Sequence, residues 1–513
     1  MMRHRIGVVG LLAGALAMGL VGCGGGGAGA SKGGAPAKPF EGVKLVVGVV
    51  GDPALLPSIK AQRGEWSART GADLVVLDRP VDPGAVRDVD VVVYPGDRMG
   101  DLVASGGLAP LPDSVINPPE APPAEGTEAT PEAPPDALAY KEVVLAYRDQ
   151  VARYGPDRMG LPIGGSALVM AYRRAAFDDP RTREAARAAG LSLEPPATWE
   201  QFDALARFFH GRERPGGGKP IAGVALAFGA DPEGVGDAIF LARAAALAWH
   251  RDQFSFLLDS ETTEPRVASP PFVEALQALV ALKGSAPPGS EKFDAEAARK
   301  AFRDGDAAIL IDLAERAGDW STEGSAVGVA PLPGSPRVHD PSRKAWEALQ
   351  VPSRPSYLPS GGGWLVGVAA SSPRKAAAED FARYLAGPDS TNRLRAERGF
   401  PMLGVRSPQL AQGMTNPRGA PGVEARPWAD AVSKTLNAEK VAPGLRIPDA
   451  AGYLADLTKA RVAAITGGES PQAALDALAR AWSERTSKLG LPRQTWHHRR
   501  SLNGPSTPAE PPK

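Results

Sequence analysis

The sequence predicts an α/β fold built on a parallel sheet, and three features of its first hundred residues lead to this expectation. Short apolar runs rich in Val and Leu alternate with stretches of helical periodicity. The first run, 43–50, is apolar almost throughout, as in a strand buried on both faces. Gly and Pro stand at the borders of the segments, where turns are expected. Strands joined by helices in this rhythm are typical of parallel sheets.

The elements follow in order along the chain. Strands are expected at 43–50, 73–77 and 88–94, with helices at 55–70 and 98–105 between and after them. Thr198 and Gln201 form a capping box ahead of a helix whose apolar residues recur at helical spacing. Further strands are expected at 167–172, 221–228, 308–311, 327–330 and 365–369, and further helices at 236–250, 271–282, 295–303, 452–466 and 471–488. A loop is expected between Gly334 and Ser360.

The N-terminus has the pattern of a bacterial lipoprotein signal. A basic start precedes the apolar run 6–20, which is shorter than the about 20 residues that a membrane-spanning helix needs. Cys23, the only cysteine, follows Leu20, Val21 and Gly22, and small residues before a cysteine match the lipobox at which the thiol is acylated. The sequence therefore predicts a signal peptide over 1–22, a lipidated (palmitate-bearing) Cys23 and a flexible spacer over 23–39.

Composition excludes several classes of partner. Lys plus Arg and Asp plus Glu number 58 each, so no overall charge attracts the protein to nucleic acid. No second apolar run approaches membrane-spanning length, which leaves the lipid as the expected anchor. The acidic, proline-rich segment 117–135 is expected to be a disordered insertion, and 490–513 a disordered tail.

Candidate ligand-binding residues follow from the rule that ligands of open α/β sheets lie beyond the carboxyl ends of the strands. The rule selects polar and aromatic residues, namely Asp52, Tyr94, Asp97, Ser166, Phe228, Asp312 and Trp364. Asp52 and Asp97 either accept hydrogen bonds from ligand hydroxyls or cap the following helices. The aromatic rings either stack on an apolar sugar face or pack in the core.

Signals of an enzyme are absent from the sequence. There is no G-x-S-x-G, H-E-x-x-H or phosphate-binding glycine loop, and Ser372 with Lys375 matches S-x-x-K without its partner motifs. His497 and His498 have no cysteine or carboxylate at metal-ligand spacing. Neither catalysis nor a metal nor another cofactor is expected.

Segments spread over residues 41–489 together resemble the family 1 extracellular solute-binding proteins, the receptors of ABC importers related to maltose-binding protein. The segments that carry the resemblance are the first apolar run, 88–92, 107–111, 160–162 with the strand after it, 196–200, 302–308, 327–333, the strand after Gly363, Gly399-Phe400-Pro401 and 467–475. The strand after Met170 reads Ala-Tyr-Arg where the family usually has Tyr-Asn.

The resemblance implies a two-lobed, periplasmic-binding-protein-like fold with hinge crossovers and a ligand cleft between the lobes. The first lobe is expected over 41–163 and 306–358, and the second over 164–305 and 359–489. Hinge crossings are then expected near Gly164, Gly305 and Gly361–Gly363. Phe400 joins the candidate ligand-binding residues because it matches the family's loop before the terminal helices.

The resemblance also implies the function. The expected protein is a lipid-anchored monomer on the extracytoplasmic side of a membrane, either the periplasmic face of the inner or outer membrane or the cell surface. It captures a small solute, a carbohydrate, by hinge closure and delivers it to an ABC transporter permease. The alternative is a receptor on the same scaffold that presents its ligand to a membrane sensor.

Overall fold

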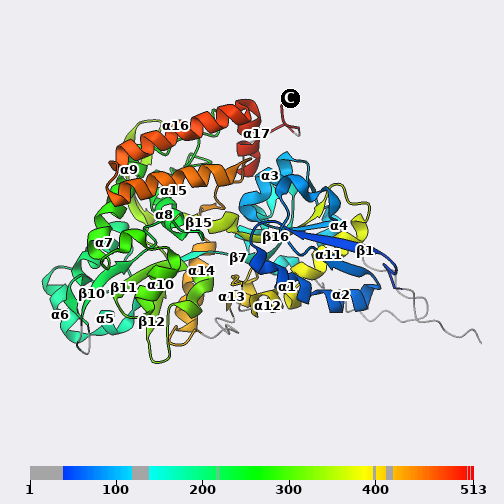
Figure 1. Ribbon diagram of the computed structural model, residues 1–513. Coiled ribbons are helices and arrows are strands. Elements are labelled where there is room, and N and C mark those ends of the chain that lie inside the picture. The colour runs from blue at the N-terminus through cyan, green and yellow to red at the C-terminus, as the bar shows by residue number, and fades with distance from the viewer. Residues whose placement is uncertain are drawn as a thin grey trace, which may run out of the picture.

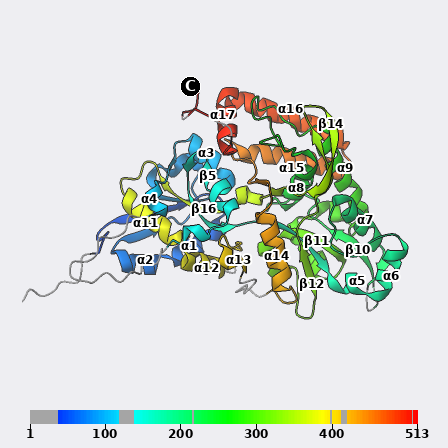
Figure 2. The same ribbon diagram turned by 180° about the vertical axis from the view of Figure 1, so that it is seen from behind.

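The computed structural model describes residues 38–117, 138–214, 217, 219–396, 400–411, 420–504, 507–508 and 510–512. The signal peptide, Cys23, most of the spacer and the insertion from residue 118 onward lie outside these residues. Figures 1 and 2 show two α/β lobes side by side, with three C-terminal helices along one edge. The α/β, two-lobed architecture predicted from the sequence is confirmed.

The first lobe contains a six-stranded sheet of order β2-β1-β3-β16-β4, with β7 also paired to β16. Its strands are β1 Lys44–Val49, β2 Asp73–Val76, β3 Val91–Pro95, β4 Leu108–Ala109, β7 Leu161–Gly165 and β16 Gly363–Ala369. β1 is parallel to β2 and β3, whereas β16 is antiparallel to its neighbours. The helices of this lobe are α1 Leu56–Ala61, α2 Arg63–Thr70, α3 Met99–Ala104, α4 Asp113–Ile116, α11 Lys375–Ala386, α12 Pro388–Ala396 and α13 Ser407–Ala411.

The second lobe contains a five-stranded sheet of order β12-β8-β11-β10-β9. Its strands are β8 Leu168–Arg173, β9 Arg212–Glu213, β10 Pro220–Ala225, β11 Ala307–Leu313 and β12 Val327–Ala330. Its helices are α5 Arg174–Asp178, α6 Pro180–Ala188, α7 Trp199–Phe209, α8 Val235–Ala248, α9 Pro270–Leu282, α10 Ala295–Arg303, α14 Ala425–Leu436, α15 Ala450–Thr466 and α16 Pro471–Leu489. The capping box of α7 forms as predicted, with Thr198 accepting from the Gln201 amide.

Small strand pairs complete the structure. They are β5 Arg153–Tyr154 with β6 Asp157–Arg158, β13 Ser335–Asp340 with β14 Ala345–Ser353, and β15 Ser356–Tyr357 with β17 Val441–Ala442. The hairpin β13–β14 occupies most of the stretch expected to be a loop, and it packs against α8.

The expected division into lobes is wrong for two segments. β11 and β12 pair with β10 and β8, and the β13–β14 hairpin packs against α8, so 306–353 belongs to the second lobe and not to the first. β16 pairs with β3 and β7, which places 363–396 in the first lobe, and residues 400–411 join the same lobe through the bridge of Leu403 with Gly165 and the hydrogen bond from Gln409 to Thr391. The reason is physical: strand partners are chosen by side-chain packing across the sheet, which strand order in the sequence does not specify.

The crossings between the lobes agree with two of the three expected hinges. The chain leaves β7 at Gly165 and enters β8 at Leu168, and it returns between β15 and β16 through Gly361–Gly363. Gly305 is instead a turn between α10 and β11, inside the second lobe, with φ of +86°. A further connection, from α13 to α14, lies partly outside the described residues.

The expected disordered tail is also wrong, because residues 491–501 form the helix α17 Leu491–Ser501. α17 lies against α3 and β5 of the first lobe and against α16 of the second. Its two histidines and Trp496 are buried. A basic composition therefore does not prevent this segment from folding, because its cationic side chains find acceptors such as Asp157, which pairs with Arg500.

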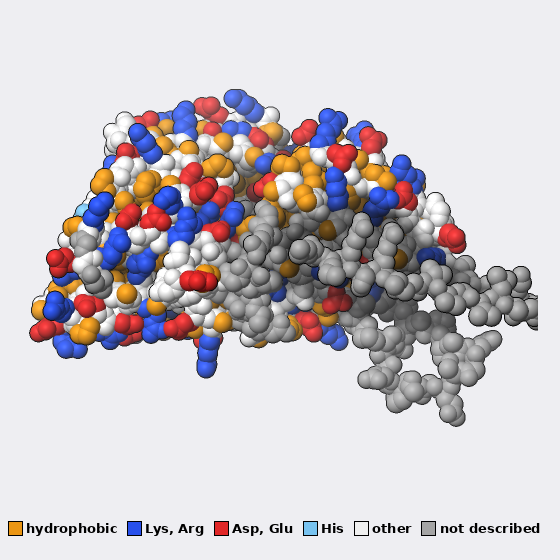
Figure 3. All heavy atoms as spheres, turned by 60° about the horizontal axis from the view of Figure 1, so that its bottom comes forward, with side chains coloured by type: hydrophobic (Ala, Val, Ile, Leu, Met, Phe, Trp, Pro, Cys, Tyr) orange, Lys and Arg blue, Asp and Glu red, His pale blue; other side chains and the backbone are white. Residues whose placement is uncertain are grey.

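The surface agrees with the balanced composition. Figure 3 shows Lys and Arg side chains interspersed with Asp and Glu over one face of the molecule. Among the described residues, no helix combines the length and apolar character that a membrane crossing requires.

Candidate functional site

A cavity of about 520 Å³ lies between the two lobes. Its volume falls in the range of small-molecule sites. The first lobe lines it with Gly51, Asp52, Pro95, Asp97, Arg98, Gly363, Trp364, Phe400 and Pro401, and the second with Ser166, Pro232, Glu233, Leu313, Glu315 and Arg316. A cavity of about 590 Å³ beside α2 and α11 is of similar size, but the first lobe alone lines it. Only a ligand in the first of these two cavities would contact both lobes.

Five of the eight predicted ligand-binding residues line the inter-lobe cavity, namely Asp52, Asp97, Ser166, Trp364 and Phe400. Asp52 follows β1, and its carboxylate accepts from the Ala54 amide at 2.8 Å, so it also caps the turn that follows. Asp97 follows β3. The strand-end rule therefore selects residues from both lobes that line the same cavity.

The aromatic part of the cavity wall consists of Trp364 and Phe400. Their rings meet edge to face with centroids 5.2 Å apart, and Trp364 is 9% exposed. Gly363, the residue before Trp364, has φ of +122°, and a Cβ there would lie 2.3 Å from the Gly164 carbonyl oxygen. Glycine is therefore required for β16 and β7 to approach each other where they meet the cavity.

Three predicted residues do not line the cavity. Tyr94 is fully buried, and its hydroxyl donates to the Met159 carbonyl at 2.9 Å. Phe228 is also buried, in the core of the second lobe. Asp312 is 1% exposed and lies behind the wall. The core alternative accounts for both aromatic residues, because an apolar ring at a strand end packs inward when space is available there.

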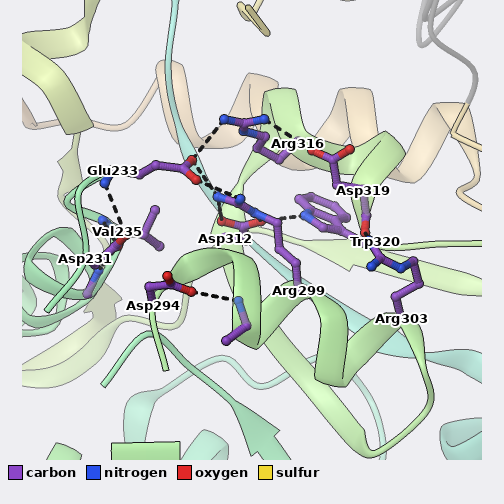
Figure 4. A network of polar contacts seen from close by, with 12 residues as sticks. Asp231, Glu233, Val235, Asp294, Arg299, Arg303, Asp312, Arg316, Asp319 and Trp320 are labelled. Carbon is purple, nitrogen blue, oxygen red and sulfur yellow. Dashed lines mark hydrogen bonds and ion pairs between the residues drawn. The ribbon is translucent and has the colours of Figure 1, made fainter. Parts of the chain in front are cut away.

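Asp312 supports the cavity from behind through a chain of polar contacts, which Figure 4 shows. It accepts from Arg299 Nε at 2.6 Å and from Trp320 Nε1 at 2.7 Å. The other end of the Arg299 guanidinium donates to both carboxylate oxygens of Glu233, at 2.9 and 2.6 Å. Glu233 is thereby held in a bidentate geometry at the cavity wall.

The charge of Glu233 is stabilised by its neighbours. Burial alone would raise the pKa of Glu233, but Arg299 and Arg316 outweigh burial and lower the pKa below its usual value. Arg316 Nη2 lies 3.2 Å from Glu233 Oε2. Glu233 is therefore a charged acceptor at neutral pH.

Glu315 has the opposite environment. Burial raises the pKa of Glu315 to about 7, although hydrogen bonds from the Ser166 hydroxyl and the Ala167 amide lower it in part. Burial likewise raises the pKa of Asp97, and Arg98 opposes this rise only in part. These two carboxylates lie in the cavity wall without a strong cationic partner, and a ligand donor would satisfy them.

Glu233, Glu315 and Arg316 also line the cavity, although the sequence did not predict them as site residues. Glu315 and Arg316 come two and three residues after β11 ends, so the strand-end rule could have included them. Glu233 lies in the loop between β10 and α8, where no residue pattern marked it. Among the described residues, no group of three or more metal-ligating side chains could hold a metal ion.

The family model "Bacterial extracellular solute-binding protein" matches residues 83–392, more than half of the chain. No curated protein sequence matches the chain.

Three solved structures of low sequence identity share the fold. An ABC transporter solute-binding protein from Agrobacterium radiobacter K84, in complex with ribitol, superposes with a TM-score of 0.60 at 21% identity, covering 87% of this chain and 100% of its own. A solute-binding protein from Agrobacterium vitis S4, with bound D-mannitol, has a TM-score of 0.59 at 17% identity. The match covers 88% of this chain and 99% of that protein's chain. The Thermus thermophilus maltotriose-binding protein, bound with maltotriose, has a TM-score of 0.55 at 20% identity, and the match covers 86% of this chain and 99% of that protein's chain. By its sequence match over more than half of its length, the chain belongs to the bacterial extracellular solute-binding proteins.

Proposed function

We propose that this protein captures a small polyhydroxylated solute in the inter-lobe cavity and delivers it to an ABC transporter permease. The observation that carries the proposal is that both lobes line one cavity with polar and aromatic side chains. A ligand that contacts both lobes stabilises the closed arrangement, because it loses half of its contacts when the lobes separate. Permease recognition of the closed form would then couple capture to transport.

The chemistry of the wall supports a carbohydrate or polyol. The carboxylates of Asp52 and Glu233 accept hydrogen bonds from hydroxyl groups. The Trp364 ring offers a rigid apolar surface to the C–H face of a sugar. The related structures hold ribitol, D-mannitol and maltotriose, so such compounds are reasonable first probes.

Lipid attachment at Cys23 is part of the same proposal. The apolar run, the small residues before Cys23 and the glycine-rich residues after it support a lipoprotein whose body stands away from the membrane. Radioactive palmitate is expected to label the protein expressed in a bacterial host and to leave a Cys23→Ser variant unlabelled. Equal labelling of both proteins, or of neither, would contradict the attachment.

We expect a bound solute to raise the melting temperature and Trp364→Ala to abolish most of that rise. Ligand at about 100 times its Kd adds about 2.7 kcal/mol to the folded state. Losing the stacking surface should weaken binding by about ten-fold or more, while Trp364→Phe should retain most of the affinity. Thermal melts with ribitol, D-mannitol and maltotriose check this.

The matched control is Trp346→Ala, since Trp346 lies on the β13–β14 hairpin, is 36% exposed and does not line the cavity. The control should keep the full ligand-dependent rise. An equal loss in both tryptophan variants, or an undiminished rise in Trp364→Ala, would contradict the assignment of the cavity.

A further inference from the structure

The inter-lobe cavity has more acidic than basic side chains in its wall. Four carboxylates line it, on Asp52, Asp97, Glu233 and Glu315. The cationic side chains that line it belong to Arg98 and Arg316. Above about pH 7, where Glu315 is ionised, the wall carries an excess of negative charge in a space partly shielded from solvent, where charge interactions are stronger than in bulk water.

Both arginines are shared with carboxylates outside the cavity. Arg316 interacts with Glu233 at 3.2 Å and with Asp319 at 3.4 Å. Arg98 lies between Asp97, at 3.8 Å, and Asp101, at 3.9 Å. Their positive charge is therefore divided, and it does not neutralise the wall.

Two carboxylates of the wall are left without an ion-pair partner in the part of the chain that the structure describes. Asp52 accepts from the Ala54 amide, and Glu315 from the Ser166 hydroxyl and the Ala167 amide, but neither forms a salt bridge. In addition, the buried Oδ1 atom of Asp97 has no hydrogen-bond partner. A carboxylate oxygen without a protein donor takes its hydrogen bond from water or from a ligand, and a solute that enters the cavity can replace water as the donor.

An ammonium group suits this wall better than a hydroxyl does. It carries three N–H donors and a full positive charge, so it can satisfy one oxygen and offset a second carboxylate at the same time. Trp364 adds an aromatic ring to the wall, and such rings attract cations as well as sugar faces.

Building on the function proposed above, we propose that the cavity selects solutes that carry an amino group as well as hydroxyls, such as amino sugars or aminated polyols, over neutral solutes of the same size. The amino group would lie among Asp97, Glu315 and Asp52, and the hydroxyls would reach Glu233. The negative charge of the wall would then favour aminated solutes over neutral solutes of the same size.

Two matched pairs of probes test the proposal. Ribitol and D-mannitol are each compared with their 1-amino-1-deoxy counterparts by isothermal titration of the full-length protein, at low salt and in 0.5 M NaCl. The aminated member should bind at least about ten-fold more tightly at low salt, and the difference should shrink in 0.5 M NaCl because salt screens charge interactions.

Two variants test whether the Glu315 carboxylate is the group that recognises the amino group of the solute. Glu315→Gln is expected to weaken binding of the aminated member more than binding of the neutral member, and so to remove most of the preference. Glu323→Gln serves as control, since Glu323 is exposed and does not line the cavity. It should leave both affinities unchanged.

The outcomes separate this inference from the proposed function. Neutral members that bind as tightly as their aminated counterparts would overturn the amine preference and leave solute capture standing. A preference that survives both Glu315→Gln and Asp97→Asn would overturn the placement of the amino group. Absence of binding by all four probes would count against both proposals.

Discussion

Replacing Arg299 by methionine is expected to lower the free energy of unfolding by about 3–5 kcal/mol, the cost of removing one partner of a buried ion pair. Asp312 is 1% exposed, and Arg299 is the cation that neutralises it. Without the guanidinium, Asp312 would keep only Trp320 as a side-chain donor. Urea unfolding followed by circular dichroism measures the difference.

The matched control for this prediction is Lys300→Ala, one residue further along α10. Lys300 is 65% exposed and pairs with Asp304 one turn away, so its removal should cost about 0.5 kcal/mol or less. Arg299→Lys should restore only part of the loss, because an ammonium cannot bridge Asp312 and Glu233 as the guanidinium does. A loss below about 1 kcal/mol for Arg299→Met would contradict the buried network as a source of stability.

Acid is expected to destabilise the protein through the two buried histidines of α17. Burial lowers the pKa of His497 to about 4, with Arg493 and Arg500 adding to the effect. Burial also lowers the pKa of His498 to about 4, and Asp259 opposes this in part. Both imidazoles are therefore neutral in the folded protein, and His497 Nδ1 lies 2.9 Å from the Tyr154 hydroxyl.

The direction follows from linkage. An unfolded histidine titrates near pH 6.5, so between that pH and about 4 the unfolded chain binds protons that the folded protein does not. The stabilisation is fully present above about pH 6.5 and is lost as the pH falls through about 4, by roughly 3 kcal/mol for each histidine. The raised pKa of Glu315 acts in the opposite sense, because its contribution is present below its usual value and lost as the pH rises through about 7.

A double variant, His497→Gln with His498→Gln, checks this prediction. The free energy of unfolding of the double variant should change much less between pH 6.5 and pH 4 than that of the wild type, whatever the variant's stability at neutral pH. Chemical denaturation at a series of pH values gives both curves. Parallel curves would show that these histidines do not carry the acid sensitivity.

Local elements were predictable from the sequence because their signals are local. The Thr198 capping box, the apolar strand β1 and the strand-end acids Asp52 and Asp97 each depend on neighbouring residues. The partners of β11 and β16 were not predictable in this way, because strand pairing depends on packing between segments distant in sequence.

The errors at the site have a similar cause. Asp312 lies near the end of an apolar strand, and the strand-end rule therefore predicts that it lines the cleft. All seven residues of β11 are buried, however, and of this strand only Leu313 lines the cavity, together with Glu315 beyond the strand end. Residues 491–501 read as a basic, solvated tail, yet the helix is held by contacts to distant segments such as that of Arg493 with the Ala104 carbonyl. An acceptor such as the Ala104 carbonyl is far from α17 in the sequence, so the sequence alone does not show that the two segments meet.

We expect a solute to bind between the lobes and to draw them together, and the distance between two spin labels, one on each lobe, tests this most directly. Cys23 is the only cysteine, so a Cys23→Ser background carries labels at Gly64→Cys in α2 and Arg187→Cys in α6 alone. Both sites are exposed, and no atom lies within 4 Å of a Cβ added at Gly64. With the solute that raises the melting temperature most, we predict a shorter label-to-label distance at saturation. An unchanged distance distribution at saturating solute would contradict closure of the lobes on a bound ligand.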